Sequence, residues 1–263
     1  MKILHINKES FRSIKNYDDT FFLGKWCTPS DDKKKYNFID HPLSDHKKRE
    51  FHYNFIENEI ESLSDIIINK LNSFHKVNFT KKNWNTILGH YLLTFSHIVY
   101  IKWLLIQNSI DLTINKIVVP DIKKPNFFVP KNLTFYKQLI QDENFYSYLT
   151  ILIIKKTDND FLLEKYIPST PTTKTVDKKS KFNFLNNFNG SQIFFYKTSI
   201  SKFDELFVKI KPKFYIKHCL FRDIETKDNI NLKIRSSLKL NNFKGFRKIL
   251  FELIWDFLPI NYL

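Results

Sequence analysis

The stretch that decides the fold runs from Thr80 to Asn108 and reads TKKNWNTILGHYLLTFSHIVYIKWLLIQN. Its apolar residues recur at steps of three and four, which predicts one long helix with a buried stripe. The residues of this stripe are Trp84, Ile87, Leu88, Tyr91, Leu92, Phe95, Ile98 and Val99. Thr80 is the expected N-cap, because its hydroxyl can accept from an unpaired amide of the first turn. Toward Asn108 the apolar surface widens until little of the helix is free for water, which places it inside a large domain. Lys102 and His97 interrupt the run too early for a membrane span, which needs about 20 mostly apolar residues.

The flanking sequence predicts an α/β fold around this helix. A second helix is expected at 47–74, and the short link before Thr80 then produces a long antiparallel helical hairpin. Short buried strands are expected at 2–6, 20–23 and 115–120, since these runs are apolar and bounded by polar residues.

Along the whole chain we expect three regions. Residues 1–155 form a helix-rich α/β region that ends in a helix at 134–155. Residues 156–181 form a flexible linker or loop, because PSTPTTKTVDKKSK is poor in apolar residues. Residues 182–263 continue the same α/β domain. The elements expected in this last region are strands at 192–196 and 213–220 and helices at 200–210 and 243–257.

Composition excludes several classes of protein. With 263 residues, of which 43% are hydrophobic, the chain can bury a sizeable core and is not disordered. The 4 glycines form no GxGxxG or GxxxxGK pattern, so neither common glycine-rich phosphate loop is present. Cys27 and Cys219 lie far apart and predict no disulfide framework, which fits a reducing cytoplasm. The first residues lack the apolar run of a secretory signal.

The net charge of +15 has two explanations. A basic chain can bind an anionic partner, such as nucleic acid, an anionic membrane surface or a phosphate-bearing substrate. The same charge follows from the joint abundance of Lys, Asn, Ile and Phe, which an AT-biased genome produces whatever the function. Lysines outnumber arginines, whereas the arginine fork is favoured where phosphates are recognised. Genome bias is the preferred explanation, and a basic, non-catalytic module that binds nucleic acid or an anionic membrane surface stays as the alternative function.

The clearest candidate site is the turn after the strand expected at 20–23. That strand ends in Gly24-Lys25-Trp26-Cys27, which places a base, an indole and a thiol together. Loops at strand ends carry the chemistry of many α/β folds. The alternative is that Trp26 and Cys27 only fill the core. We expect no metal site, because the histidines and aspartate within 41–46 lack the spacing of a known zinc motif.

Several short motifs, taken in order, resemble a known family. Leu23-Gly24-Lys25-Trp26-Cys27 matches a leucine-glycine-x-tryptophan-cysteine signature at the end of a strand. Leu71-Asn72 and His75 stand at the end of the helix expected at 47–74, and Trp84 and Ile87-Leu88-Gly89 stand near the start of the next one. This ordered set resembles bacterial transferases encoded in O-antigen and other surface-polysaccharide loci. The resemblance covers most of this chain but only about the first half of a typical member.

The resemblance implies both fold and activity. It predicts the helix-rich N-terminal half of a GT-B-like, Rossmann-like glycosyltransferase, with a nucleotide-sugar donor, a glycan acceptor and no further cofactor. Such an enzyme works in the cytoplasm, peripheral to the inner membrane. The glutamine-histidine-glycine-glycine segment of the family's donor-binding half does not occur in this sequence. We therefore expect a truncated or split gene, with the second half encoded separately.

The resemblance also implies which residues contact the substrates. In this hypothesis Trp26 stacks on a sugar face, lysines hold anionic groups, and His90 is the catalytic base near neutral pH. The substrate-binding residues are Lys25, Trp26, Cys27, Lys82 and Trp84. Two positions depart from the family pattern, since Lys82 replaces an arginine and His90-Tyr91 replaces proline-tryptophan. A lysine at position 82 loses the bidentate recognition of phosphate or carboxylate that arginine provides.

Overall fold

The computed structural model describes residues 2–14, 19–28, 36–122, 128–157, 159–167, 192–194, 215–217, 232–239 and 242–263. The chain divides into two compact units, one of residues 1–173 with 230–263 and the other of residues 174–229. In the second unit β6 (Gln192–Phe194) pairs in parallel with β7 (Tyr215–Lys217), and both strands fall where the sequence predicts strands. The helix expected at 200–210 lies outside the described residues.

The first unit is α/β, as expected, and contains a parallel sheet of five strands in the order β3-β2-β1-β4-β5. The strands are β1 (Ile3–His5), β2 (Thr20–Phe22), β3 (Asn37–Phe38), β4 (Lys116–Pro120) and β5 (Leu162–Tyr166). Leu4 at the centre is in register with Phe21 on one side and with Ile117 on the other. Buried residues follow one another along β4 because helices cover parallel strands on both faces.

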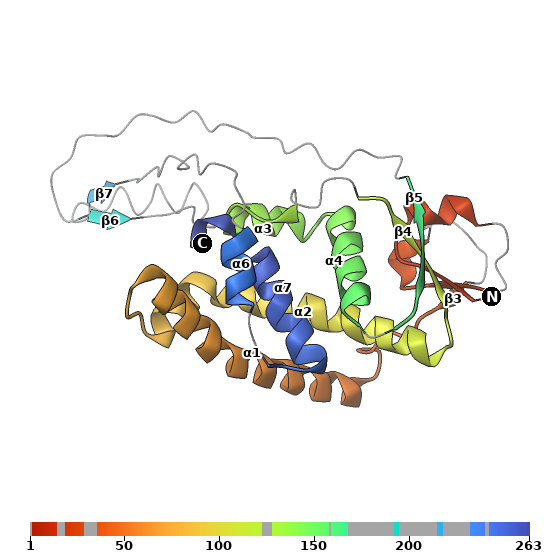
Figure 1. The fold of residues 1–263 in the computed structure, drawn as a ribbon, viewed down its shortest axis with the longest axis horizontal. Coiled ribbons are helices and arrows are strands. Elements are labelled where there is room, and N and C mark those ends of the chain that lie inside the picture. The colour runs from red at the N-terminus through yellow and green to blue at the C-terminus, as the bar shows by residue number, and fades with distance from the viewer. Residues whose placement is uncertain are drawn as a thin grey trace. The chain divides into compact units, whose positions relative to one another are not determined.

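Helices account for most of the remaining described residues of this unit. They are α1 (His46–His75), α2 (Lys81–Asp111), α3 (Leu133–Leu139), α4 (Glu143–Lys156), α6 (Leu232–Leu238) and α7 (Gly245–Phe257). Figure 1 shows α4 standing between the sheet and the other helices, and α2 running from beside the sheet into the helical part of the unit, with α7 beside α2. None of the helices in the described ranges is both long and apolar enough to cross a membrane.

The helix expected from Thr80 onward is α2, and it begins as the sequence predicts. The Thr80 side chain accepts from the amide of Asn83, and the Asn83 side chain accepts from the amide of Thr80, a reciprocal capping box. The two ends of α2 belong to different cores. Residues from Trp84 to Tyr100 pack among the helices, whereas Leu105 and Ile106 pack under the sheet. The surface of α2 is apolar nearly all round because one end packs against helices and the other end packs against the sheet.

The connection between α1 and α2 is closed by the side chain of Asn72. This side chain donates to the carbonyl of Phe79 at 2.9 Å and accepts from its amide at 3.2 Å. Lys76 between the two helices takes a left-handed conformation with φ 55°. Near the other end of α1, Nδ1 of His52 lies 2.8 Å from the hydroxyl of Tyr100. Residues early in α1 thus contact residues late in α2.

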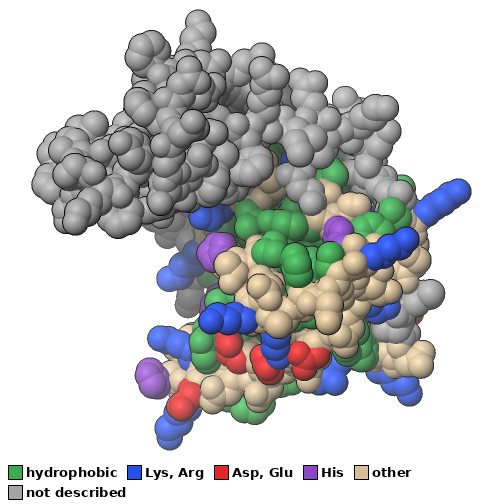
Figure 2. All heavy atoms as spheres, turned by 90° about the vertical axis from the view of Figure 1, so that its left-hand side faces the viewer, with side chains coloured by type: hydrophobic (Ala, Val, Ile, Leu, Met, Phe, Trp, Pro, Cys, Tyr) green, Lys and Arg blue, Asp and Glu red, His purple; other side chains and the backbone are tan. Residues whose placement is uncertain are grey.

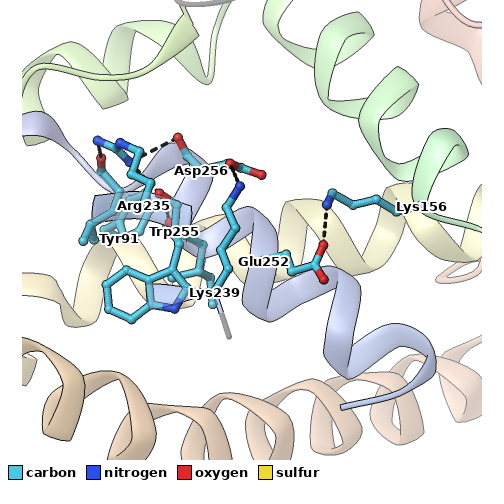
Figure 3. Close-up of polar contacts among 9 residues, drawn as sticks. Tyr91, Lys156, Arg235, Lys239, Glu252, Trp255 and Asp256 are labelled. Carbon is cyan, nitrogen blue, oxygen red and sulfur yellow. Dashed lines mark hydrogen bonds and ion pairs between the residues drawn. The ribbon is translucent and has the colours of Figure 1, made fainter. Parts of the chain in front are cut away.

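A buried arginine closes the C-terminal end of α7 (Figure 3). Arg235 donates to the carbonyls of Trp255 at 2.5 Å, Asp256 at 3.2 Å and Leu258 at 2.7 Å. These carbonyls have no partner within the helix, because the last turn leaves its acceptors unpaired. Burial lowers the pKa of Arg235. Lys239, also in Figure 3, forms an ion pair with Asp256.

The structure differs from the sequence prediction in the segment 156–181. The first part of the expected linker contains β5, which pairs with β4 along its whole length. This strand is at the edge of the sheet and is mostly exposed, and the polar composition that predicts a linker belongs to the residues after it, 168–181. Lys116 in β4 forms an ion pair with Glu164 at 2.5 Å. Residues 168–181 lie outside the described ranges, and the expected region 182–263 divides between the two units.

Candidate functional site at the carboxyl edge of the sheet

All five strands run in one direction, so their carboxyl ends meet at one edge of the sheet. The chain moves from β1 to β2 on one side and places β4 on the other side of β1. Ligands of open α/β sheets bind outside the carboxyl ends at such a switch point. The segments that leave this edge from the three central strands are the loop after β1, the turn after β2 and the residue Asp121 after β4.

The loop after β1 is fixed by a single buried amide. Asn7 donates from Nδ2 to the hydroxyl of Ser147 at 3.2 Å. Its Oδ1 accepts from the amide of Ser10 at 3.1 Å and from the hydroxyl of Tyr166 at 2.7 Å. Beside it, the carboxylate of Glu143 accepts from the amide of Lys8 at 2.8 Å. These bonds join the end of β1 to the first turns of α4 and to the end of β5, which makes this side of the edge rigid.

The turn after β2 is a short 3-10 helix, Lys25–Cys27, whose indole folds back over Gly24. A Cβ atom added to Gly24 would lie 2.3 Å from the six-membered ring of Trp26. The backbone of Gly24 is extended, so the ring and not the backbone conformation requires a glycine. Leu23 before it and Cys27 after it are buried in the core under the sheet. The glycine of the motif thus allows Trp26 to lie against its own turn.

A lysine of α2 lies against this indole. Nζ of Lys102 is 4.6 Å from the ring centroid of Trp26 and 5.2 Å from that of Tyr146. The Lys102 side chain is only 8% exposed, whereas Trp26 is 44% exposed. Burial lowers the pKa of Lys102 to about 8. Trp26 is therefore an exposed ring at the sheet edge with a buried cation beneath it.

Cys27 is fully buried in the core under the sheet. Burial raises the pKa of its thiol to about 12, and the nearby Lys102 offsets only part of that effect. A thiol that stays neutral is neither a metal ligand nor a nucleophile, because both roles need the thiolate. Of the three predicted residues in this turn, Lys25 and Trp26 reach solvent and Cys27 packs in the core.

Comparison with known proteins places the chain among transferases. The family described as LIC12162 family transferase matches it over residues 3–263. The chain belongs to this family. No curated protein and no solved structure matches it.

In this LIC12162 family transferase the other predicted site residues lie at the far end of α2. Lys82 and Lys102 are separated by about 30 Å along the helix, at about 1.5 Å per residue, and His90 is about 18 Å from Lys102. Lys82 and His90 are both exposed. The structure therefore does not bring them together with Lys25 and Trp26 in one small pocket.

Trp84 has a structural position in the same region. It is buried, and its Nε1 donates to Oδ1 of Asn72 at 2.8 Å. His75 lies beside the ring, with 6.0 Å between centroids, and its Nε2 is 3.0 Å from the carbonyl oxygen of Tyr262. These motif residues hold the connection between α1 and α2 against the last residues of the unit. The contacts of Trp84 therefore favour a structural role for this residue.

Sequence reasoning missed Lys102, Asn7, Tyr146 and Tyr166. The signal for Lys102 is a single lysine in a helix that is apolar nearly all round, which by itself indicates only that the helix does not span a membrane. Asn7 and the two tyrosines belong to no motif. Their proximity comes from the sheet order, which brings β1, β5 and α4 to one edge.

A separate hollow of about 480 Å³ lies between α1 and α6 and contains none of the predicted site residues. Its lining residues are Ile66, Asn69, Lys70, Ser73, Phe74 and Leu238. Figure 2 shows the face of the molecule that carries the connection between α1 and α2, where exposed hydrophobic side chains lie among lysines, arginines and acidic residues. Within the described ranges no cluster of three or more His, Cys, Asp or Glu side chains is arranged to hold a metal ion.

Proposed function

We propose that this LIC12162 family transferase is a glycosyltransferase-like enzyme of O-antigen or other surface-polysaccharide assembly. It passes a sugar from a nucleotide-sugar donor to a glycan acceptor at the cytoplasmic face of the inner membrane. The proposal includes a GT-B-like arrangement in which the parallel sheet and an antiparallel hairpin of α1 and α2 form the acceptor-side domain. The parallel strand order and the contacts between α1 and α2 support this fold.

The observation that carries the proposal is Trp26, a half-exposed indole at the carboxyl edge of a parallel sheet in a transferase. Aromatic faces offer sugars a flat apolar surface, and this edge is where open α/β sheets bind their ligands. Lys25 stands next to it in solvent and is available to an anionic group. We place the substrate contacts at this edge, and the participation of His90, Lys82 and Trp84 at the other end of α2 stays a prediction.

Binding measurements test the proposal without a known acceptor. Wild-type protein is titrated calorimetrically with UDP-, GDP- and CMP-linked sugars and with the matching free nucleotides. We expect at least one nucleotide sugar to bind more tightly than its nucleotide, because the sugar adds a contact with Trp26. The Trp26→Ala variant removes that difference, whereas Trp103→Phe, a ring stacked on Tyr100 in the helical core, keeps it.

Two results would overturn the proposal. One is an equal affinity for every nucleotide sugar and its free nucleotide. The other is binding to generic DNA that falls steeply as salt rises, with no effect of nucleotide sugars. That pattern is the signature of a basic nucleic-acid-binding module, in which counterion release dominates the affinity.

A further inference from the structure

The environment of Lys102 is unusual for a buried cation. Its charge lies against two ring faces, those of Trp26 and Tyr146, and no hydrogen bond or ion pair to it is found in the described part of the chain. Two titratable groups interact electrostatically with Lys102: the thiol of Cys27, which affects the pKa of Lys102, and the ring of His41, whose pKa Lys102 helps to lower. Neither supplies a negative charge, since the pKa of Cys27 is raised to about 12 and a histidine is neutral or positive.

Burying a cation without an acidic partner costs free energy, and contacts with aromatic faces offset only part of it. Fully buried polar atoms without a hydrogen-bond partner occur in the described residues, for example Nε1 of Trp255, but Nζ of Lys102 is not one of them. The amino group of Lys102 therefore keeps some contact with solvent. A cation held in this way, at the edge where the fold binds ligands, is suited to an anion that arrives with the substrate.

We propose that Lys102, held between the rings of Trp26 and Tyr146, binds the diphosphate group of the substrate at the carboxyl edge of the sheet. This inference rests on the proposed function and assigns the phosphate contact to a residue of α2. The Trp26 ring then contacts the sugar, and the ammonium beneath it holds the adjoining phosphate oxygens. Lys25 lies on the solvent side of the same turn.

A diphosphate can come from either substrate. It can belong to the nucleotide of the donor or to the lipid carrier of the acceptor, and the chemistry that Lys102 recognises is the same. The probes that separate these sources are UDP or GDP for the donor and farnesyl diphosphate for a lipid carrier. Inorganic pyrophosphate reports the shared group alone.

The test compares Lys102→Met with wild type, with Lys102→Arg and with Lys137→Met. Methionine keeps the length and apolar character of the stem and removes the charge. Lys137 is an exposed lysine of α3, so its replacement is a control with the same change in net charge. We expect Lys102→Met to weaken pyrophosphate binding at least tenfold, Lys102→Arg to restore part of it, and Lys137→Met to leave it unchanged. Equal binding by wild type and Lys102→Met overturns the inference.

A second measurement needs no variant and therefore does not depend on the folding of one. Wild-type protein is treated with an amine-acylating reagent, with and without pyrophosphate, and the modified lysines are located by peptide mass spectrometry. Pyrophosphate is expected to protect Lys102 and not Lys137. Modification of Lys102 to the same extent with and without pyrophosphate contradicts the inference.

The two proposals fail separately. If a nucleotide sugar binds through Trp26 but Lys102→Met binds it as well as wild type does, the proposed function stands and Lys102 is not the diphosphate contact. If pyrophosphate requires Lys102 but no nucleotide sugar binds, the phosphate site stands and the proposed donor is wrong. Tighter binding of farnesyl diphosphate than of UDP or GDP assigns the site to a lipid-linked acceptor.

Discussion

Replacing Gly24 by alanine tests the local structure of the candidate site. The new Cβ atom would lie 2.3 Å from the Trp26 ring, so the ring must move. The backbone of Gly24 is extended and tolerates alanine without strain. The whole effect should therefore come from moving the indole, which now lies 4.6 Å from Nζ of Lys102.

The expected cost combines two terms. A lost cation–π contact is worth about 0.5–2 kcal/mol, and forced repacking costs about 1–3 kcal/mol. The ring is partly exposed and can move, so the lower part of the second range applies, and we expect Gly24→Ala to reduce the free energy of unfolding by about 2 kcal/mol. In a Trp26→Ala background the same substitution should cost less than about 0.5 kcal/mol, because the atoms nearest the new Cβ are gone.

The assay is a double-mutant cycle measured by urea unfolding with circular dichroism, which avoids the signals of the other tryptophans. A coupling of about 1.5 kcal/mol between the two positions supports the structure of this turn. The coupling should shrink at pH 10, because the pKa of Lys102 is about 8 and the neutral amine makes no cation–π contact. Equal costs of Gly24→Ala in the two backgrounds would refute the reasoning.

Four further variants test other parts of the structure, each by urea unfolding. Arg235→Met leaves three carbonyls at the end of α7 unpaired and should lower the free energy of unfolding by about 3–5 kcal/mol. Lys239→Met removes one partly exposed ion pair and should lower it by less than about 1 kcal/mol. Equal losses in the two variants contradict the capping role of Arg235. Asn72→Ala removes the bonds to Trp84 and to the turn and should cost about 2–3 kcal/mol while pyrophosphate affinity stays the same, so a loss of affinity would place this end of α2 in the site. Burial lowers the pKa of His5 from 6.5 to about 4, so the unfolded chain binds more protons than the folded chain between these two pH values. As pH falls through that window, the free energy of unfolding of wild type should drop by up to about 3 kcal/mol. His5→Gln should lose less, and the same pH profile in this variant as in wild type contradicts the assignment.

The part of the fold that sequence could predict is the part with strong periodicity. The helix α2, its cap at Thr80 and the short strands β1, β2 and β4 follow from apolar spacing and capping chemistry. The edge strand β5 could not be predicted in this way, because it is mostly exposed and its sequence, LLEKY, has neither a long apolar run nor a regular alternation of apolar and polar residues. Its place in the sheet depends on pairing with β4, a contact between distant residues.

The candidate site shows the same limit. The turn at Lys25 and Trp26 was identified because its residues are adjacent in sequence. Its partner Lys102 could not be, since only the packing of α2 against the sheet brings it beneath the indole. Conversely, grouping Lys82 and His90 with that turn assumed a proximity that the length of α2 does not provide.

The motifs that carry the family resemblance lie in two groups, one near each end of α2. Asn72, His75 and Trp84 form contacts that hold helices and the last residues together. Gly24 and Trp26 shape an exposed ring at the sheet edge. We therefore expect substitutions in the first group to lower stability and substitutions in the second group to lower substrate affinity.

The most direct test of the substrate site is a ¹⁵N NMR titration that follows the indole N–H signals of the 4 tryptophans. Trp26 marks the carboxyl edge of the sheet, Trp84 marks the start of α2, and Trp103 and Trp255 belong to the helical core. With pyrophosphate and with the nucleotide sugar that binds most tightly, we expect a saturable shift of the Trp26 signal while the Trp84 signal stays in place. A shift of Trp84 with no change at Trp26 would contradict it and move the site to the end of α2 that carries Lys82 and His90.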